Sequence, residues 1–177
     1  GATAQFNGPE GVAVDAAGNV YVADRFNHRI RVVSAAGVVV TFAGSVQGWV
    51  DAQGTAAEFN GPRGIAVAPS GTVYVADSGN LLVRQITPAG LVSTLPAIGT
   101  SLSQPVGLAF DGIGQLIVGD FGAGVIRTFN PAGVTPYVGA SLTAGGITYG
   151  ARQLIFSPTT AGLTLTMVNG GDCSSSG

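Results

Sequence analysis

The chain has 177 residues, a net charge of −2 and a pI of about 5.0, and all seven of its basic residues are arginine. This balance argues against nucleic acid as a partner, because binding to phosphates needs many cationic contacts. Hydrophobic residues make up 46% of the chain, yet no stretch approaches the roughly 18 uninterrupted apolar residues of a spanning helix, so we expect no membrane insertion.

The sequence repeats itself. Residues 6–14, FNGPEGVAV, return as FNGPRGIAV at residues 59–67, a displacement of 53 residues from Pro9 to Pro62. The segments GNVYVAD and GTVYVAD that follow keep the same displacement, and a looser third copy places Pro105 43 residues after Pro62. Repeats of this size indicate one supersecondary unit that is used several times.

Each copy contains four short segments rich in Val, Ile, Tyr and Phe, separated by turn residues, which predicts four strands. The connections are so short that neighbouring strands must be antiparallel. The predicted strands are residues 11–15, 20–24, 29–34 and 38–43 in the first copy, 64–68, 72–77, 82–87 and 91–95 in the second, and 107–111, 115–120, 125–130 and 134–138 in the third. No helix is needed.

A four-stranded antiparallel sheet that repeats with this period buries both faces only by stacking on its neighbours around an axis. We therefore predict an all-β fold, a β-propeller whose blades occupy about residues 9–44, 62–97 and 105–140. An eroded fourth copy, with strands at 146–149, 153–156 and 163–167, predicts a further blade at 145–169 that lacks its outer strand. The propeller segment then covers residues 1–171, and residues 172–177 form a flexible tail.

The motifs Pro-x-Gly-Ile/Val-Ala-Val and Val-Tyr-Val-Ala-Asp, and above all FNHRIR at residues 26–31, resemble the NHL repeats of six-bladed β-propellers. The resemblance covers residues 1 to about 140. The second copy has Asn80-Leu81-Leu82 where the first has Asn27-His28-Arg29, and the third has no counterpart. The resemblance implies a propeller fold and is not specific as to function.

About 3.75 blades do not obviously close a ring, since closed propellers usually have about four to eight. The chain also begins inside a repeat, because GATAQF at residues 1–6 matches GTAAEF at residues 54–59. We expect a piece of a longer propeller in preference to the alternative, in which several copies complete a ring or stack and so cover the apolar faces of the end blades.

An aspartate ends the second strand of each clear copy, and an arginine follows seven residues later. These recurrent pairs are Asp24 with Arg31, Asp77 with Arg84, and Asp120 with Arg127. They predict a structural role in which each aspartate accepts backbone hydrogen bonds from the turn it opens and each arginine packs its stem across the blade. The alternative is a ring of carboxylates that binds a cation; recurrence disfavours it, because chemistry needs different groups at one point.

We expect no catalytic, metal or cofactor site in this chain. Cys173 is the only cysteine and His28 the only histidine, so neither a disulfide nor a multi-histidine metal centre can form within it. The resemblance implies two enzymatic relatives, the peptidyl-hydroxyglycine amidating lyases with metal-binding histidines and lactonase-type propellers with a Glu, Asn and Asp set around calcium. Neither set is recognisable, so a fragment of such a lyase or lactonase, with other ligands outside the chain, is the alternative function.

The long connection between the first two blades, residues 45–58, carries the single tryptophan, Trp49. In a propeller this connection lies on the same rim as the loops between second and third strands. The candidate protein-binding rim is therefore Arg25, Phe26, Asn27, His28, Trp49, Asp51, Ser78, Asn80 and Phe121. A tryptophan on such a rim is a typical binding hot spot, although we expect in preference that Trp49 folds back over the blade junction and that His28 bonds within its loop.

The sequence thus predicts a non-enzymatic propeller module for protein binding or assembly. Its lysine-free, charge-poor composition favours an extracellular, periplasmic or cell-envelope setting. Self-association into filaments through open blade faces and strand edges is a further alternative.

Overall fold

The computed structural model describes residues 4–95 and 102–131, together with strands at 141–144, 147–150, 153–159, 162–168 and 173–174. The chain divides into two compact units, residues 1–129 and 130–177. Regular structure in the described ranges is β-strand apart from four single turns of 3-10 helix, which confirms the all-β prediction. None of the helices described here could cross a membrane.

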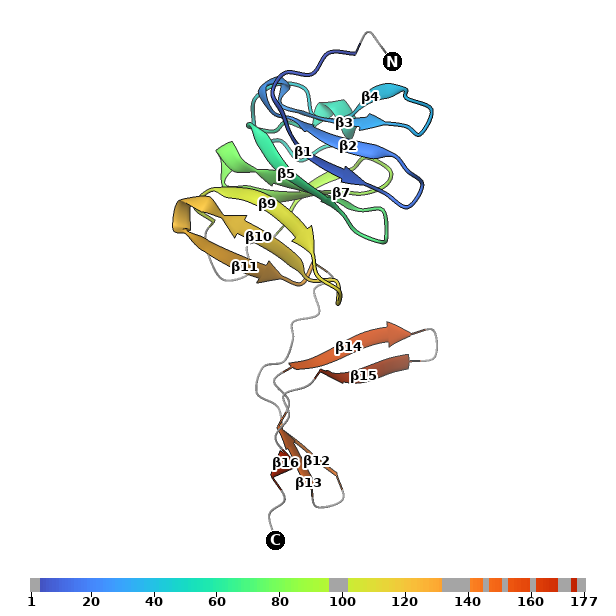
Figure 1. The fold of residues 1–177 in the computed structure, drawn as a ribbon, viewed down its shortest axis with the longest axis vertical. Helices are drawn as coiled ribbons and strands as arrows, with labels where there is room; N and C mark the ends of the chain where they lie inside the picture. The colour runs from blue at the N-terminus through green and yellow to red at the C-terminus, as the bar shows by residue number, and fades with distance from the viewer. Residues whose placement is uncertain are drawn as a thin grey trace. The chain divides into compact units, whose positions relative to one another are not determined.

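The first two copies of the repeat form four-stranded antiparallel sheets whose strands follow the sequence order (Figure 1). Blade 1 comprises β1 (Pro9–Val14), β2 (Val20–Asp24), β3 (Arg29–Val33) and β4 (Val39–Ala43), and blade 2 comprises β5 (Pro62–Val67), β6 (Val73–Asp77), β7 (Leu82–Ile86) and β8 (Val92–Thr94). The predicted strands of both blades are confirmed to within two residues. The largest differences are at β1 and β5, which start two residues earlier than predicted and carry a register shift after the proline.

Blade 3 contains β9 (Pro105–Phe110), β10 (Leu116–Asp120) and β11 (Val125–Phe129), again antiparallel and in sequence order around β10. Its predicted outer strand, residues 134–138, lies outside the described residues.

Each blade joins its second and third strands through one turn of 3-10 helix. These turns are η1 (Arg25–Asn27), η3 (Ser78–Asn80) and η4 (Phe121–Ala123), and η2 (Gly54–Ala56) lies in the long connection. The residue after each of the three turns has a left-handed backbone, with φ of 56° at His28, 60° at Leu81 and 66° at Gly124. The sequence predicts plain loops here, because three residues are too few to show a helical period.

The blades stack through apolar side chains, and their inner strands β1, β5 and β9 lie side by side (Figure 1). Between blades 1 and 2 the core contains Tyr21, Ala23, Ile30, Phe59, Ile65, Val73, Val75 and Ile86; between blades 2 and 3 it contains Ala66, Tyr74, Val83, Leu116, Val118 and Phe129. Successive residues of β6 point to opposite faces of the sheet, so this strand contributes to both cores. That explains its continuous apolar run.

The second unit contains β12 (Ser141–Ala144), β13 (Ile147–Gly150), β14 (Gln153–Thr159), β15 (Gly162–Val168) and β16 (Cys173–Ser174). The strands pair as two sheets, β12-β13-β16 and β14-β15, whereas the sequence predicts one meander. The pairs β12-β13 and β14-β15 are hairpins of strands adjacent in sequence. Their connecting loops are short, and short loops cost the least entropy to close, which favours this local pairing. β16 also falls in the predicted tail. A fourth blade at residues 145–169 stays a prediction.

Candidate functional site

Each described blade buries the aspartate that ends its second strand and pairs it with the arginine seven residues later. The nitrogen–oxygen distances are 3.5 Å for Arg31 and Asp24, 3.0 Å for Arg84 and Asp77, and 2.9 Å for Arg127 and Asp120. The spacing has a simple origin in blade 2: antiparallel pairing puts Leu82 opposite Asp77, so Arg84 lies two residues further along on the same face.

The other carboxylate oxygen holds the chain that enters the blade. Oδ1 of Asp24, Asp77 and Asp120 accepts a 2.7 Å hydrogen bond from the backbone N–H of Asn7, Asn60 and Gln104, respectively. The sequence predicts backbone bonds from the turn that follows each aspartate, and this is wrong. The chain that enters each blade runs antiparallel to the second strand and passes beside the aspartate. The backbone N–H groups that bind the carboxylate therefore belong to the entering chain and not to the turn that follows.

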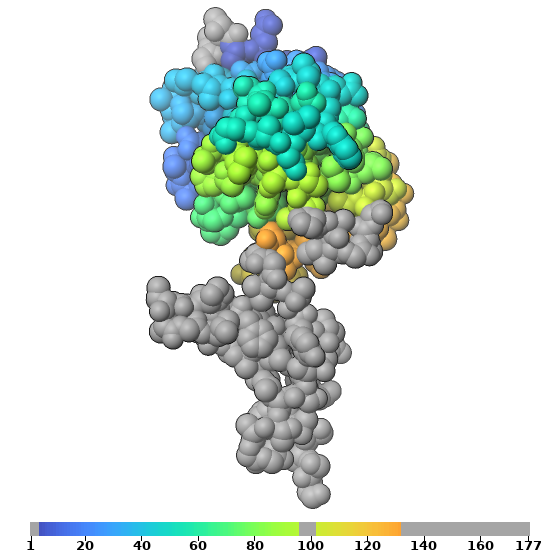
Figure 2. All heavy atoms as spheres, turned by 180° about the vertical axis from the view of Figure 1, so that it is seen from behind, coloured from blue at the N-terminus to red at the C-terminus, as the bar shows by residue number. Residues whose placement is uncertain are grey.

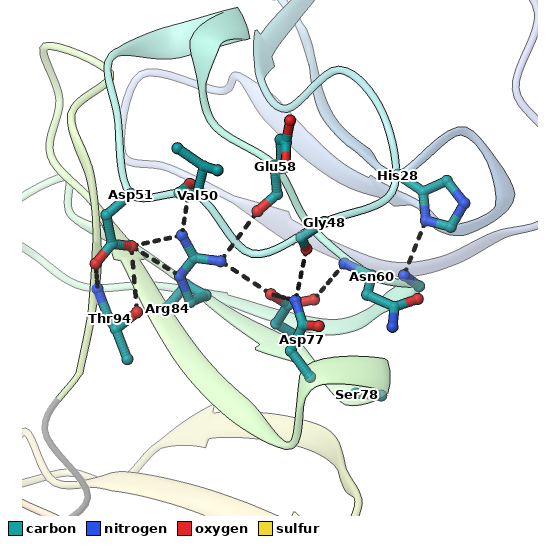
Figure 3. A network of polar contacts seen from close by, with 12 residues as sticks. His28, Gly48, Val50, Asp51, Glu58, Asn60, Asp77, Ser78, Arg84 and Thr94 are labelled. Atoms are coloured by element: carbon teal, nitrogen blue, oxygen red, sulfur yellow. Dashed lines mark hydrogen bonds and ion pairs between the residues drawn. The ribbon is translucent and has the colours of Figure 1, made fainter.

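Arg84 has the densest set of contacts and its side chain is fully buried (Figure 3). Besides Asp77, its guanidinium bonds to Asp51 and donates to the backbone carbonyls of Val50 at 2.9 Å and Glu58 at 3.1 Å. The guanidinium also lies 5.1 Å from the centre of the Phe59 ring. Arg84 therefore joins blade 2 to three points of the long connection.

The carboxylates of this network have pKa values that differ in direction. Burial raises the pKa of Asp77, and the hydrogen bonds from Asn60, Asn80 and Arg84 oppose that effect. Burial also acts to raise the pKa of Asp51, but the hydrogen bonds from the Thr94 backbone N–H and the Arg84 guanidinium outweigh this effect, so the pKa of Asp51 is lowered. Ionised Asp51 is therefore a favourable partner of Arg84, whereas burial disfavours the ionised form of Asp77 and Asn60, Asn80 and Arg84 together support it.

The long connection, which we call the long loop (residues 45–58), lies along the outer strand of blade 2. Ala52 accepts a hydrogen bond from the Val92 N–H at 2.9 Å, and the Gly54 N–H donates to Gly90 at 2.8 Å. In Figure 2 the cyan atoms of the loop lie against the yellow-green atoms of that strand. The loop thus gives the outer edge of blade 2 a hydrogen-bonding neighbour.

Trp49 projects from this loop with 71% of its surface exposed. The backbone is fixed on both sides of it: the Gly48 carbonyl accepts from the Asn80 side chain at 2.7 Å, and the Val50 carbonyl accepts from Arg84 and from the Glu58 N–H. The expectation that Trp49 folds back over the blade junction is wrong, because the loop is already held by polar contacts to blade 2. The tryptophan is exposed on a fixed backbone.

We expect the fluorescence anisotropy of Trp49 to stay constant from about pH 8 to about pH 5 and to fall below about pH 4. The pKa of Asp51 is lower in the folded protein than in the unfolded chain. The stability that its charge contributes is therefore present above the pKa of the unfolded chain, and it is lost as the pH falls through the pKa of the folded protein. Asp51→Asn should give a low anisotropy without this transition. An unchanged anisotropy at about pH 3, in protein whose circular dichroism is still native, would contradict the role of Asp51.

The other predicted rim residues divide into exposed and structural groups. Phe26 and Phe121, on η1 and η4, are 55% and 72% exposed. Ser78 is buried and donates to the Pro105 carbonyl. The Asn27 and Asn80 amides donate to Asp24 and Asp77, and the Asp51 carboxylate binds Arg84 and Thr94. The most exposed side chains of the rim are thus aromatic, and most of its polar residues make hydrogen bonds that fix its backbone.

A family model agrees with the geometry of the blades. The NHL repeat model matches residues 6–33 and 59–86, which are the first three strands of blades 1 and 2 with the turn that precedes them. Blades 1 and 2 therefore each match an NHL repeat. It is 36% identical over 94 residues to NHL repeat-containing protein 2 of Gallus gallus and 34% identical over 88 residues to the chloroplastic protein Suppressor of quenching 1 of Arabidopsis thaliana. These matches take in 51% and 49% of this chain, but only 13% and 8% of those relatives.

Solved structures extend the likeness of the fold. An auxiliary nutrient binding protein of Bacteroides thetaiotaomicron matches with a TM-score of 0.58 and 20% identity over 66% of this chain and 36% of that one. A gluconolactonase of Xanthomonas campestris matches with a TM-score of 0.57 and 15% identity over 92% of this chain and 63% of that one. A virginiamycin B lyase of Staphylococcus aureus matches with a TM-score of 0.52 and 17% identity over 94% of this chain and 57% of that one. At these identities the likeness concerns the β-propeller fold alone.

On the rim, a hollow of about 230 Å³ opens where blades 1, 2 and 3 approach one another. Its lining includes Arg25, Phe26, His28, Asn60, Arg63 and Gln104. Three of these are among the predicted rim residues; Asn60, Arg63 and Gln104 are not. The signal that could have found Arg63 is the variable residue of Pro-x-Gly, which is Glu10 in blade 1, Arg63 in blade 2 and Val106 in blade 3. Among the described residues, no three His, Cys, Asp or Glu side chains form a group suited to a metal ion.

Proposed function

We propose that this chain is a non-enzymatic NHL-repeat module that binds a partner protein through its rim. The observation that carries the proposal is Trp49, which is 71% exposed on a loop whose backbone is held by Arg84 and Asn80. Exposed tryptophans dominate the energetics of many interfaces. A loop already fixed in its binding conformation loses little entropy on association, so the binding energy is not spent on ordering it.

Phe26 and Phe121 extend the proposed surface. Both lie on the 3-10 turns between second and third strands, the same edge of the blades that holds the Asn80 contact to Gly48. Three exposed aromatic residues among hydrogen-bonded asparagines give the mixture of apolar anchors and polar surroundings that protein interfaces use. The low charge and absence of lysine support an extracellular or cell-envelope setting.

We expect Trp49→Ala to weaken binding of the partner by about 30-fold or more, the effect of losing a hot spot of at least about 2 kcal/mol. To identify the partner, a photo-reactive phenylalanine analogue replaces Trp49, Phe26 or Phe121 in separate variants, and cross-linked proteins are collected from extracts of the native host. All three positions should capture the same protein. Affinity for that purified protein is then measured by calorimetry.

Val38 and Ile113 supply the matched controls, because they are exposed to 57% and 53% but lie in hairpin connections away from the rim. The analogue at either control position should capture little of that protein. Equal capture at the control and rim positions, or an unchanged affinity of Trp49→Ala, would contradict the proposed rim.

A second candidate function, assembly from copies of this chain, is favoured by the open face of blade 1. Val12 is 65% exposed, whereas its counterpart Ile65 in blade 2 is 5% exposed because blade 1 covers it. No described segment covers Val12 and Val14 in the same way. A second copy that placed a blade there would bury these valines as blade 1 buries Ile65.

Light scattering over a wide range of protein concentrations tests this assembly. We expect particles larger than one chain, and Val12→Glu should return them to monomers by placing a charge on the open face. A strict monomer at every concentration would exclude self-assembly and leave the binding proposal standing.

A further inference from the structure

Two arginines from different blades meet at one carboxylate beside the rim hollow. Nη1 of Arg25, on η1, lies 3.2 Å from Glu10, and Nε of Arg63, on β5, lies 3.6 Å from the other oxygen of the same side chain. All three side chains are partly exposed to solvent. Two guanidinium groups share one carboxylate, so this group of three carries a surplus positive charge.

The residues of this cluster do not recur from blade to blade. The position of Arg25 is Ser78 in blade 2, and the position of His28 is Leu81. By contrast, the Asp–Arg pairs and the Pro-x-Gly motif recur in all three blades because they build the fold. Different groups that converge on one point are the pattern expected of a binding site rather than of repeated structure.

Neighbouring groups orient the cluster. The Arg25 guanidinium lies 4.8 Å from the centre of the Phe26 ring, a cation–π contact that holds it beside the hollow. Nδ1 of His28 accepts a 3.0 Å hydrogen bond from the Gly61 N–H, so in the neutral imidazole Nε2 carries the proton and is a donor. The hollow therefore combines two guanidinium groups with a further N–H donor.

We propose that the hollow binds a peptide carboxylate of the partner protein, either an acidic side chain or a C-terminus, between Arg25 and Arg63. This inference rests on the proposed protein-binding function. At about 230 Å³ the hollow is smaller than the roughly 300–1,000 Å³ of pockets that enclose whole small molecules. It suits a single side chain or chain end. Guanidinium groups bind carboxylates through paired, charge-assisted hydrogen bonds.

Glu10 is the internal competitor of this site. It occupies the two guanidinium groups in the free protein, and the incoming carboxylate takes its place. Removing its charge therefore strengthens the binding of an external carboxylate, whereas removing Arg63 weakens it. A general loss of stability would weaken carboxylate binding in both variants, so opposite effects on the affinity indicate a specific site.

The test is an NMR titration of the full chain that follows the arginine Nε–Hε signals. The probes are N-acetylglycine, with a terminal carboxylate, the α-amide of N-acetylglutamic acid, with a side-chain carboxylate, and the α-amide of N-acetylglutamine, a neutral isostere. We expect one or both carboxylates to shift the Arg25 and Arg63 signals to saturation, and which one does so identifies the source. The neutral probe should shift neither.

Glu10→Gln should bind the carboxylate about tenfold more tightly, and Arg63→Gln at least about tenfold more weakly. Arg29→Gln, which removes an arginine that does not line the hollow, should bind as the parent does. If Arg63→Gln fails to fold, Glu10→Gln decides. Equal shifts with the neutral probe, or no shifts with either carboxylate, would overturn the inference. Cross-linking from position 49 to one partner would still support the rim in that case, so the two failures are distinguishable.

Discussion

Replacing Arg84 with methionine is expected to lower the free energy of unfolding by about 3–5 kcal/mol, the usual cost of breaking a buried ion pair from one side. The variant keeps most of the side-chain volume but loses every hydrogen bond and ion pair that Arg84 makes with Asp77 and with the long loop. Asp77 then remains fully buried without its cation, and burial already raises its pKa. Urea unfolding at neutral pH measures the loss through the transition midpoint and slope.

Arg31→Met is the matched control in blade 1. The pair of Arg31 with Asp24 is longer, at 3.5 Å, and the Arg31 side chain is partly exposed, so water compensates for part of the loss. We expect this variant to lose less than half as much stability as Arg84→Met. The double variant Arg84→Met/Asp77→Asn should regain part of the loss by removing the stranded charge. Equal losses at Arg31 and Arg84 would show that the contacts to the long loop contribute nothing.

Gly64→Ala is expected to destabilise the protein by about 1–3 kcal/mol through the junction of blades 2 and 3. A Cβ atom at Gly64 would meet the Val106 carbonyl oxygen, and it would lie 3.0 Å from the backbone nitrogen of Leu108. Both neighbours are backbone atoms of β9, so no rotamer change can relieve the contact and the inner strands must separate. Chemical unfolding detects the effect, and loss of signal dispersion in NMR spectra locates it.

Gly107 occupies the same place in the Pro-x-Gly motif of blade 3 and provides the control. Among the described residues no atom lies within 4 Å of a Cβ built there. Gly107→Ala should therefore change the stability by no more than about 0.5 kcal/mol. If both alanine variants lose the same stability, the glycine is needed for backbone conformation and not for the close approach of the blades.

The blades could be predicted from the sequence because their information is local and repeated. Alternation of apolar residues and the turn residues between them determine each strand. The spacing of seven residues predicts that Asp77 and Arg84 belong together, since antiparallel pairing of adjacent strands puts them on one face. Two copies with the same spacing remove the ambiguity that one short apolar segment would leave.

The long loop could not be predicted in the same way. Asp51 binds Arg84, 33 residues away, and no repeat or period in the sequence indicates that contact. The exposure of Trp49 follows from the loop contacts and not from the residue type, so its orientation could not be read from the sequence. The hollow depends on Arg25 and Arg63 from different blades, and only the stacking of those blades brings both to Glu10.

Time-resolved fluorescence of Trp49, the single tryptophan, in the presence of acrylamide tests most directly whether the rim is built before a partner binds. The structure predicts efficient quenching together with slow depolarisation at the rate of the whole folded unit, because the side chain is exposed and the backbone beside it is held. A shielded tryptophan, or one whose anisotropy decays within about a nanosecond, would contradict the account.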